Sequence, residues 1–179
     1  MTAHSPVRKT WSELSTAELY GIVKLRTDVF YLEQKVDEEE LDWRDAEPAT
    51  VHYWLTDEAG TITAYLRVLT DAQPEHLDAR HAIGRVVTHP LHRGKGLAQV
   101  LLTAAVEEFG HEAMLLHAQS YVAGLYARVG FEAFGEEYLE AGIPHLSMYR
   151  PGSAAQASAA GSAAGSAAQG DSGAAFGSR

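Results

Sequence analysis

The sequence contains no cysteine among its 179 residues. This absence excludes a disulfide framework, a thiolate nucleophile and any zinc site built on cysteine. No apolar run approaches the roughly 20 residues that a membrane-spanning helix needs, and the N-terminus has no apolar stretch like that of a secretory signal. We therefore expect a soluble, cytoplasmic protein that is not bound to a membrane.

Basic residues are scarce beside acidic ones, since 14 lysines and arginines face 24 aspartates and glutamates, for a formal charge of −10. A chain this acidic repels phosphate backbones, so nucleic acid is not expected as a partner. The same charge would attract a cationic substrate, although acidity also serves solubility alone.

The C-terminal stretch lacks apolar periodicity. Of residues 151–179, 23 of 29 are glycine, alanine or serine, a composition that predicts a disordered tail or a linker. Residues 1–150 remain, a length typical of one domain with its own core. The two charges of the tail, Asp171 and Arg179, cancel, so the acidity belongs to the domain.

Hydrophobic periodicity predicts an α/β domain with the element order β-α-β-β-β-α-β-α-β-β. The central strand–helix–strand unit should pair its strands in parallel through a right-handed crossover, and the flanking hairpins make the sheet mixed. The strands are expected at residues 7–11, 50–56, 61–70, 82–88, 113–118, 131–138 and 145–150, and the helices at 15–30, from a glycine segment to about 109, and at 121–129.

Three features of the N-terminal half carry local signals. The first predicted helix begins at a capping box, in which Ser15 accepts from the backbone of Glu18 and Glu18 reaches back to Ser15. Its apolar stripe is interrupted by Arg26, which either lies at the edge of the stripe or pairs with an acid.

Residues 37–47 carry seven carboxylates in eleven positions. Such a run disfavours a regular element and is usually solvated, although it can also border an acceptor site and attract an amine.

The strongest functional signal lies between a predicted strand and a predicted helix, in the segment Arg93-Gly94-Lys95-Gly96-Leu97-Ala98. The first N–H groups of a helix lack partners and carry partial positive charge, so they bind anions. The glycines let a ligand approach the backbone, while Arg93 and Lys95 add positive charge for a pyrophosphate. The spacing excludes a Walker A loop, because no hydroxyl follows Lys95, and a dinucleotide loop, because Gln99 stands at the third glycine position.

This segment matches the signature of the GNAT superfamily of N-acetyltransferases, namely Arg or Gln, two residues, Gly, one residue, and Gly or Ala. Residues 125–131, Leu-Tyr-Ala-Arg-Val-Gly-Phe, resemble the helix that follows the fifth strand of that family. A narrower resemblance to the ElaA-like branch rests on Gln119, two residues after His117, and on residues 29–34, 83–86 and 142–145. The resemblance covers residues 10 to about 150.

The resemblance implies the GNAT-type acyl-CoA N-acyltransferase fold, a central mixed sheet whose parallel strand pair splays apart between flanking helices. It places the pantetheine arm of acetyl-CoA in that gap and the pyrophosphate at residues 93–98. Further implied contacts to acetyl-CoA are Val86, Val87, Thr88 and Gln119. A backbone N–H freed at the gap can polarise the thioester carbonyl. No metal is implied, and His89 with His92 lacks a third ligand.

In the usual mechanism of this family the amine attacks the thioester directly, so no enzyme nucleophile is needed. The family's tyrosine falls on Tyr126, the expected general acid, because a hydroxyl with a pKa of about 10 can protonate a departing thiolate whose thiol has a pKa of about 8.5. The candidate general bases are Glu33, at the end of the first helix, and His145, at the start of the last strand. A water relay or no dedicated base is equally open. The structural alternatives are a core aromatic, a solvated acid and a histidine bonding a turn.

We therefore expect an enzyme that moves an acetyl group from acetyl-CoA to a primary amine of a small molecule or peptide, acting as a monomer or homodimer. The alternative is a non-catalytic domain that binds CoA as a sensor or scaffold. The acceptor does not follow from the fold, because the superfamily accepts many amines on one cofactor site.

Overall fold

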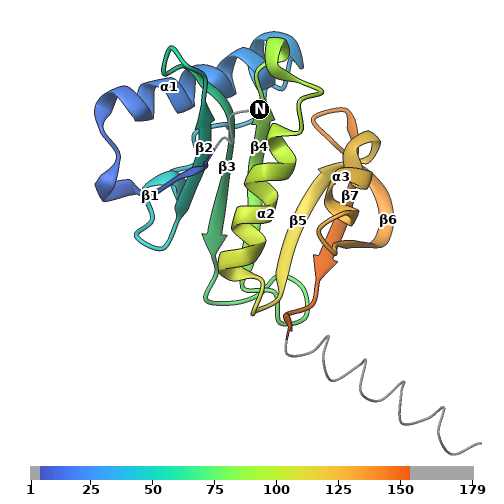
Figure 1. The fold of residues 1–179 in the computed structure, drawn as a ribbon. Helices are drawn as coiled ribbons and strands as arrows, with labels where there is room; N and C mark the ends of the chain where they lie inside the picture. Colours follow the sequence, from blue (N-terminus) through green and yellow to red (C-terminus); the bar gives the residue numbers. More distant parts are fainter. Residues whose placement is uncertain (1–4, 154–179) are drawn as a thin grey trace, which may run out of the picture.

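The chain folds around a seven-stranded mixed sheet. The computed structural model describes residues 5–153, and the strand order in the sheet is β1-β2-β3-β4-β5-β7-β6 (Figure 1). The strands are β1 (Val7–Thr10), β2 (Val51–Thr56), β3 (Ile62–Thr70), β4 (His81–Thr88), β5 (Met114–Gln119), β6 (Glu132–Glu140) and β7 (Ile143–Arg150). The helices are α1 (Thr16–Arg26), α2 (Leu97–Phe109) and α3 (Ala123–Ala127). The predicted order of elements is confirmed, with α3 shorter than expected because a 3-10 turn precedes it.

The two faces of the sheet are covered by different helices. Successive side chains of a strand point to opposite faces. On β2, Tyr53 packs in the core cluster that contains α2, while Trp54 packs in the cluster that contains α1. Leu101 of α2 and Ile22 of α1 are both almost fully buried, and each such side chain stabilises the fold by roughly 1.5–3 kcal/mol. The helices α1 and α2 therefore cover opposite faces of the sheet.

The first helix changes its winding along its length. The predicted capping box is confirmed, with Glu18 N to Ser15 Oγ at 3.2 Å and Ser15 N to Glu18 Oε2 at 2.9 Å. After α1 the chain continues as a π-helix, Thr27–Glu33, where a regular helix was predicted to residue 30. Such segments are frequent at functional sites, because the wider turn redirects side chains. Here Glu33 and the next residue, Gln34, line a cavity beside the sheet.

The parallel strands β4 and β5 separate partway along their length. Their shared register ends at the pair Ile83↔Leu116, whereas β5 continues to Gln119 with β7 as its partner. The predicted splayed pair is confirmed, and Figure 1 shows the sheet dividing between β1–β4 and β5–β7. Among the described residues, the stretch 84–88 of β4 has no strand partner on the side that faces β5.

A β-bulge bends β4 where this gap begins. Between the pairs that join β3 to Gly84 and to Val87, two residues of β4, Arg85 and Val86, oppose a single residue of β3. Arg85 has a φ of 55°, which is uncommon for a residue that carries a side chain. Because a bulge increases twist and bends its strand, this one turns β4 away from β5.

The packed structure runs slightly past residue 150. The N–H of Ser153 donates to the carbonyl of Gly110 at 3.0 Å, and a Cβ on Gly152 would lie 2.5 Å from the carbonyl oxygen of His111. Residues 151–153 thus pack against the end of α2, while the rest of the predicted tail, 154–179, lies outside the described residues. Within the described part of the chain, no helix combines the length and apolar character that a membrane crossing requires.

Candidate functional site

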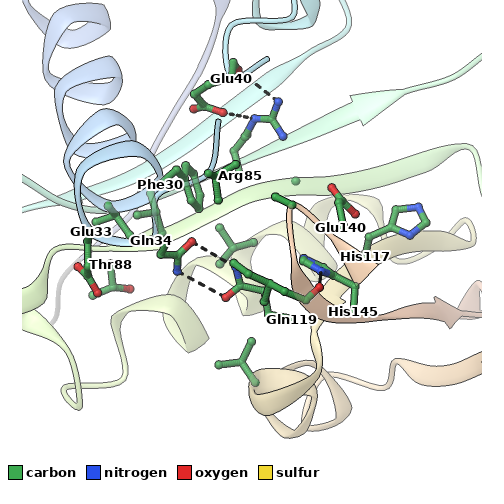
Figure 2. Close-up of a pocket in the computed structure, with 18 of the residues that line it drawn as sticks. Phe30, Glu33, Gln34, Glu40, Arg85, Thr88, His117, Gln119, Glu140 and His145 are labelled. Atoms are coloured by element: carbon green, nitrogen blue, oxygen red, sulfur yellow. Dashed lines mark hydrogen bonds and ion pairs between the residues drawn. The ribbon is translucent and has the colours of Figure 1, made fainter. Parts of the chain in front are cut away.

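The gap between β4 and β5 opens into a cavity of about 670 Å³ (Figure 2). Its walls are the π-helix, residues 38–41 of the acidic segment, the separated ends of β4 and β5, α3, and the turn between β6 and β7. The structure brings nine of the predicted site residues to this cavity, namely Glu33, Val86, Val87, Thr88, Arg93, Ala98, Gln119, Tyr126 and His145.

The glycine loop, residues 93–98, joins the end of β4 to α2. Gly94 and Gly96 have φ values of 73° and 77°, and nothing lies within 4 Å of a Cβ built on either. Glycine is therefore favoured there by the left-handed backbone rather than by crowding. Gly94, Gly96 and Leu97 line a second cavity beside the first, whereas Lys95 lines neither cavity and has no side-chain partner shown among residues 5–153.

Tyr126 presents an uncharged donor to the cavity. The residue lies in α3, is 6% exposed and belongs to the core cluster on the α2 face. Burial, with a smaller effect of Tyr121, raises the pKa of its hydroxyl to about 12, so this group stays protonated at neutral pH. Within the described residues the hydroxyl has no hydrogen-bond partner shown. It is therefore available to a ligand.

Arg93 and Glu33 form a bidentate ion pair across the cavity mouth. Arg93 Nη1 lies 2.7 Å from Glu33 Oε1 and Nη2 lies 2.8 Å from Oε2, while Nε donates to the carbonyl of Thr88 at 3.2 Å. The hydrogen bonds from Arg93 lower the pKa of Glu33. Arg93, the cation expected at the pyrophosphate, and Glu33, a candidate base, thus neutralise each other. This ion pair was not predicted from the sequence.

The side-chain amide of Gln119 is hydrogen-bonded to that of Gln34. Gln119 Nε2 donates to Gln34 Oε1 at 3.2 Å, and Gln34 Nε2 lies 3.5 Å from Gln119 Oε1, as the dashed lines in Figure 2 show. The two amides connect the end of the π-helix to β5. Gln34 was not among the predicted site residues, because the π-helical winding that directs it into the cavity was not expected. The available signal was its place in the ElaA-like stretch 29–34.

His145 lies at the start of β7, opposite Gln119 on β5. Its Nδ1 is 2.8 Å from the carbonyl oxygen of Ile143, which can only accept, so Nδ1 carries the proton in this contact. In the neutral ring Nε2 then keeps its lone pair. The ring is stacked on Tyr138, with centroids 6.0 Å apart. The structural alternative for His145, a hydrogen bond to a turn, is therefore present. The same bond sets the tautomer in which Nε2 can act as a base.

The acidic segment is not simply solvated, as its composition suggested. Asp45 lies 2.9 Å from Arg26 Nη1 and 2.9 Å from Arg67 Nη1, and these arginines are only 1% and 2% exposed. Glu40 also pairs with Arg26, and Asp42 with Arg67. The second alternative for Arg26, an acid partner, is confirmed. A buried guanidinium requires paired carboxylates, so part of the acidic run packs against the sheet.

The same network fixes the bulge of β4. Arg85 Nε lies 2.6 Å from Glu40 Oε2 (Figure 2), and Nη2 lies 3.2 Å from the carbonyl oxygens of Glu39 and Glu40. Although burial acts to raise it, the contacts with Arg67 and Arg85 lower the pKa of Asp42 to about 2. A positive φ is unfavourable for a residue with a side chain and persists only where surrounding contacts fix it. The contacts of the Arg85 side chain with Glu39 and Glu40 provide this restraint.

The cavity wall away from the glycine loop keeps acidic groups without basic partners. Glu38 accepts from the backbone N–H of Ala141 at 3.0 Å, and Glu39 and Glu140 line the cavity without a side-chain partner shown in the described structure. This wall is therefore negative, in contrast to the glycine loop.

His117 lines the cavity as the first residue of β5 beyond the last β4 pair. Its Nδ1 lies 2.7 Å from the hydroxyl of Tyr138, and its Nε2 lies 3.2 Å from a carboxylate oxygen of Glu75. His117 was not among the predicted site residues and served only to define the spacing to Gln119. Its position two residues before Gln119, hence on the same face of β5, was the available signal. Within residues 5–153, no group of three or more His, Asp or Glu is arranged to hold a metal ion.

Comparison with known proteins gives consistent matches over the same residues. A family model described as an acetyltransferase (GNAT) domain matches residues 17–150. A UPF0039 protein of Mycobacterium tuberculosis is 39% identical over 150 residues, which cover 82% of this chain and 94% of that protein. The protein ElaA of Escherichia coli is 33% identical over 148 residues, which cover 78% of this chain and 91% of that protein.

Solved structures show the same likeness in three dimensions. An acyl-CoA N-acyltransferase from Pseudomonas aeruginosa superposes with a TM-score of 0.72 at 36% identity, over 83% of this chain and 99% of that one. The crystal structure of Escherichia coli ElaA gives a TM-score of 0.74 at 28% identity, with the same coverage of 83% and 99%.

Proposed function

The chain belongs to the GNAT acetyltransferase superfamily, in its ElaA-like branch, and on this premise we propose that it transfers an acetyl group from acetyl-CoA to a primary amine. The observation that carries the proposal is the unpaired stretch 84–88 of β4, which lines the same cavity as Tyr126 and leads into the glycine loop. A strand without a partner on one side offers backbone donors and acceptors to an extended ligand, as the amide groups of a pantetheine arm require.

The donor, acetyl-CoA, extends from the glycine loop into the gap beside β4. Its pyrophosphate lies at residues 93–98, where the first N–H groups of α2 have no partner inside the helix. Its pantetheine arm lies beside Val86, Val87 and Thr88, with the thioester at the inner end of the gap. A backbone N–H of the bulged strand polarises the thioester carbonyl and stabilises the oxyanion that forms during attack.

Acetyl transfer proceeds by direct attack of the amine. The amine nitrogen forms a bond to the carbonyl carbon, the carbon–sulfur bond breaks, and the thiolate of CoA leaves with its electron pair. Tyr126 donates a proton or a hydrogen bond to that thiolate as its charge develops. Burial raises the pKa of Tyr126 to about 12, so the hydroxyl meets the leaving thiolate with its proton in place.

The proton of the attacking amine leaves on the acceptor side. Of the two candidate bases, His145 has an unpaired ring nitrogen in its neutral tautomer, whereas the pKa of Glu33 is lowered by Arg93. We therefore assign the base to His145. The acceptor enters past Glu38, Glu39 and Glu140, whose uncompensated charges favour an amine that arrives as a cation.

His145→Gln is expected to lower kcat/KM about a hundredfold, the lower end for loss of a general base. Glu33→Gln serves as the comparison, and its kcat should stay within a few-fold of the parent. Steady-state thiol release measures both variants. A hundredfold loss of kcat in the Glu33 variant together with parental kcat/KM in the His145 variant would exchange their roles.

Amide hydrogen exchange tests the position of the donor. Acetyl-CoA should slow exchange in peptides that cover residues 84–88 and 93–98, because ligand contacts protect backbone N–H groups that lack partners. Exchange in the β2–β3 hairpin should not change. Binding without protection of residues 84–88 would show that the donor does not lie in the gap. Absence of any binding would contradict the proposal. A non-catalytic CoA sensor would show the same protection but no transfer to any amine.

A further inference from the structure

A second group of polar side chains lies next to His145, on the strands β5, β7 and β6. Tyr138 stands opposite His145 in the β6–β7 ladder, and its ring is stacked on the imidazole with centroids 6.0 Å apart and planes at 29°. The Tyr138 hydroxyl lies 2.7 Å from Nδ1 of His117, whose Nε2 lies 3.2 Å from a carboxylate oxygen of Glu75. Figure 2 shows His117 and His145 on the same side of the cavity. A chain of contacts thus runs from Glu75 through His117 and Tyr138 to His145.

Both ring nitrogens of His117 are occupied by these contacts. A carboxylate can only accept, so Nε2 carries the proton and donates to Glu75, which leaves Nδ1 as an acceptor. Burial raises the pKa of Tyr138, so its hydroxyl keeps the proton that it donates to Nδ1. Ser147 Oγ lies 3.3 Å from the same nitrogen. The neutral ring therefore has no lone pair free for an amine, and His117 holds Tyr138 rather than acting as a base.

A bulge in β6 places Tyr138 opposite His145. Between the pairs that Phe134 and Tyr138 form with β7, three residues of β6 oppose a single residue of β7. The first of the three, Gly135, has a φ of 71°, which glycine adopts without strain. In a regular ladder Glu136 would stand opposite His145 instead. Bulges beside functional sites commonly redirect a side chain in this way, and here the result is a ring against the imidazole.

The loop between β3 and β4, residues 71–80, keeps Glu75 beside His117. The Glu75 side chain is 68% exposed, and an exposed pair by itself restrains little. The next residue, His76, supplies the restraint, because its ring is stacked on Phe134 of β6 with centroids 3.8 Å apart. Docking of the loop on β6 therefore fixes the carboxylate that sets the tautomer of His117.

We propose that Tyr138 is a positioning residue for His145, and that Glu75 and His117 fix Tyr138 in place. The inference rests on the proposed function, because it takes His145 as the group that receives the proton of the amine. The bond from Nδ1 to the carbonyl oxygen of Ile143 restrains one edge of the imidazole, and the stacked phenol ring restrains its face. Together they hold Nε2 in one orientation, because a base must stay within hydrogen-bond reach of the proton that it accepts.

Substitution of Tyr138 tests this role through its dependence on His145. Tyr138→Leu removes the stacked ring and should lower kcat/KM about thirtyfold, part of the loss expected for His145→Gln, since a small misplacement of a reacting group is costly. In the His145→Gln background the same substitution should cost about twofold or less, because a residue that acts through His145 then has nothing to position. Steady-state thiol release with acetyl-CoA and a panel amine that the parent acetylates gives the four rates.

Tyr138→Phe is the matched conservative variant, since it keeps the ring and loses only the bond to His117. Its kcat/KM should recover to about threefold below the parent, the loss expected for one neutral hydrogen bond. Parental kcat/KM in Tyr138→Leu, or an equal loss in both backgrounds, would overturn the inference while the proposed function stands. If the parent acetylates no amine of the panel, the proposed function fails together with the inference.

Nitrogen NMR of the imidazole rings tests the holding contacts without an acceptor. In the full-length protein labelled with nitrogen-15, neutral His117 should carry its proton on Nε2 and neutral His145 on Nδ1. The signals of His117 are assigned by their loss in His117→Gln. Tyr138→Leu should mix the two tautomers of His145, because the ring is then free to turn. A proton on Nδ1 of His117 would contradict donation from Tyr138 and overturn the role of Glu75 and His117.

Discussion

With Tyr126 replaced by phenylalanine, kcat is expected to fall about a thousandfold, while the affinity for acetyl-CoA stays within a few-fold. The substitution removes one hydroxyl from a side chain that is otherwise packed in the core, so the shape of the cavity is kept. The loss falls on kcat because the thiolate charge that the hydroxyl stabilises exists only in the transition state. Steady-state thiol release gives kcat, and calorimetry gives the affinity for acetyl-CoA.

Tyr53→Phe separates catalysis from packing in this experiment. Tyr53 is also buried, and its hydroxyl bonds Glu108 on α2, but it does not line the cavity. This variant should lose stability and keep kcat. A Tyr126 variant with parental kcat would remove the general acid from the account, and an equal loss of kcat in both variants would point to general disruption of the core.

Asp45→Asn is expected to lower the free energy of unfolding by about 3 kcal/mol, toward the lower end for breaking a buried ion pair. Asp45 bridges Arg26 and Arg67, and its side chain is 11% exposed. Without its charge, two buried guanidinium groups share only Glu40 and Asp42. The asparagine keeps the volume of the side chain, so the change reports charge rather than a cavity. Urea unfolding of the parent and variant measures the difference.

Asp28→Asn provides the matched surface substitution. Asp28 pairs with Lys24 one helical turn away, and their side chains are 30% and 60% exposed. Exposed pairs of this kind contribute about 0.5 kcal/mol or less. If the Asp45 variant were no less stable than the Asp28 variant, the buried network would not anchor the acidic segment to the sheet.

The elements that sequence analysis predicted correctly depend on local signals. The capping box at Ser15, the interruption of an apolar stripe by Arg26, and the strand–glycine–helix junction at residues 93–98 each follow from spacing within a few residues. The order of the elements along the chain and the splay of β4 from β5 were also anticipated, the splay through resemblance to GNAT proteins. Placement of nine predicted residues around one cavity follows from that topology.

The features that escaped prediction depend on contacts between distant segments. Glu33 meets Arg93 across 60 positions and Gln34 meets Gln119 across 85, so neither pair has a local pattern. The π-helix that directs Glu33 and Gln34 forms where a regular helix was expected. The solvated interpretation of the acidic segment was wrong for Asp45 because its arginine partners lie on α1 and β3.

Transfer of an isotopically labelled acetyl group tests the central claim most directly. The protein is incubated with labelled acetyl-CoA and a panel of small-molecule amines and peptides, and the products are analysed by mass spectrometry. The account predicts labelled acetyl on the nitrogen of at least one amine, with one CoA thiol released for each acetyl transferred. It also predicts that this product depends on Tyr126. Tight binding of acetyl-CoA with no labelled product on any amine would contradict the account and support a CoA-binding sensor.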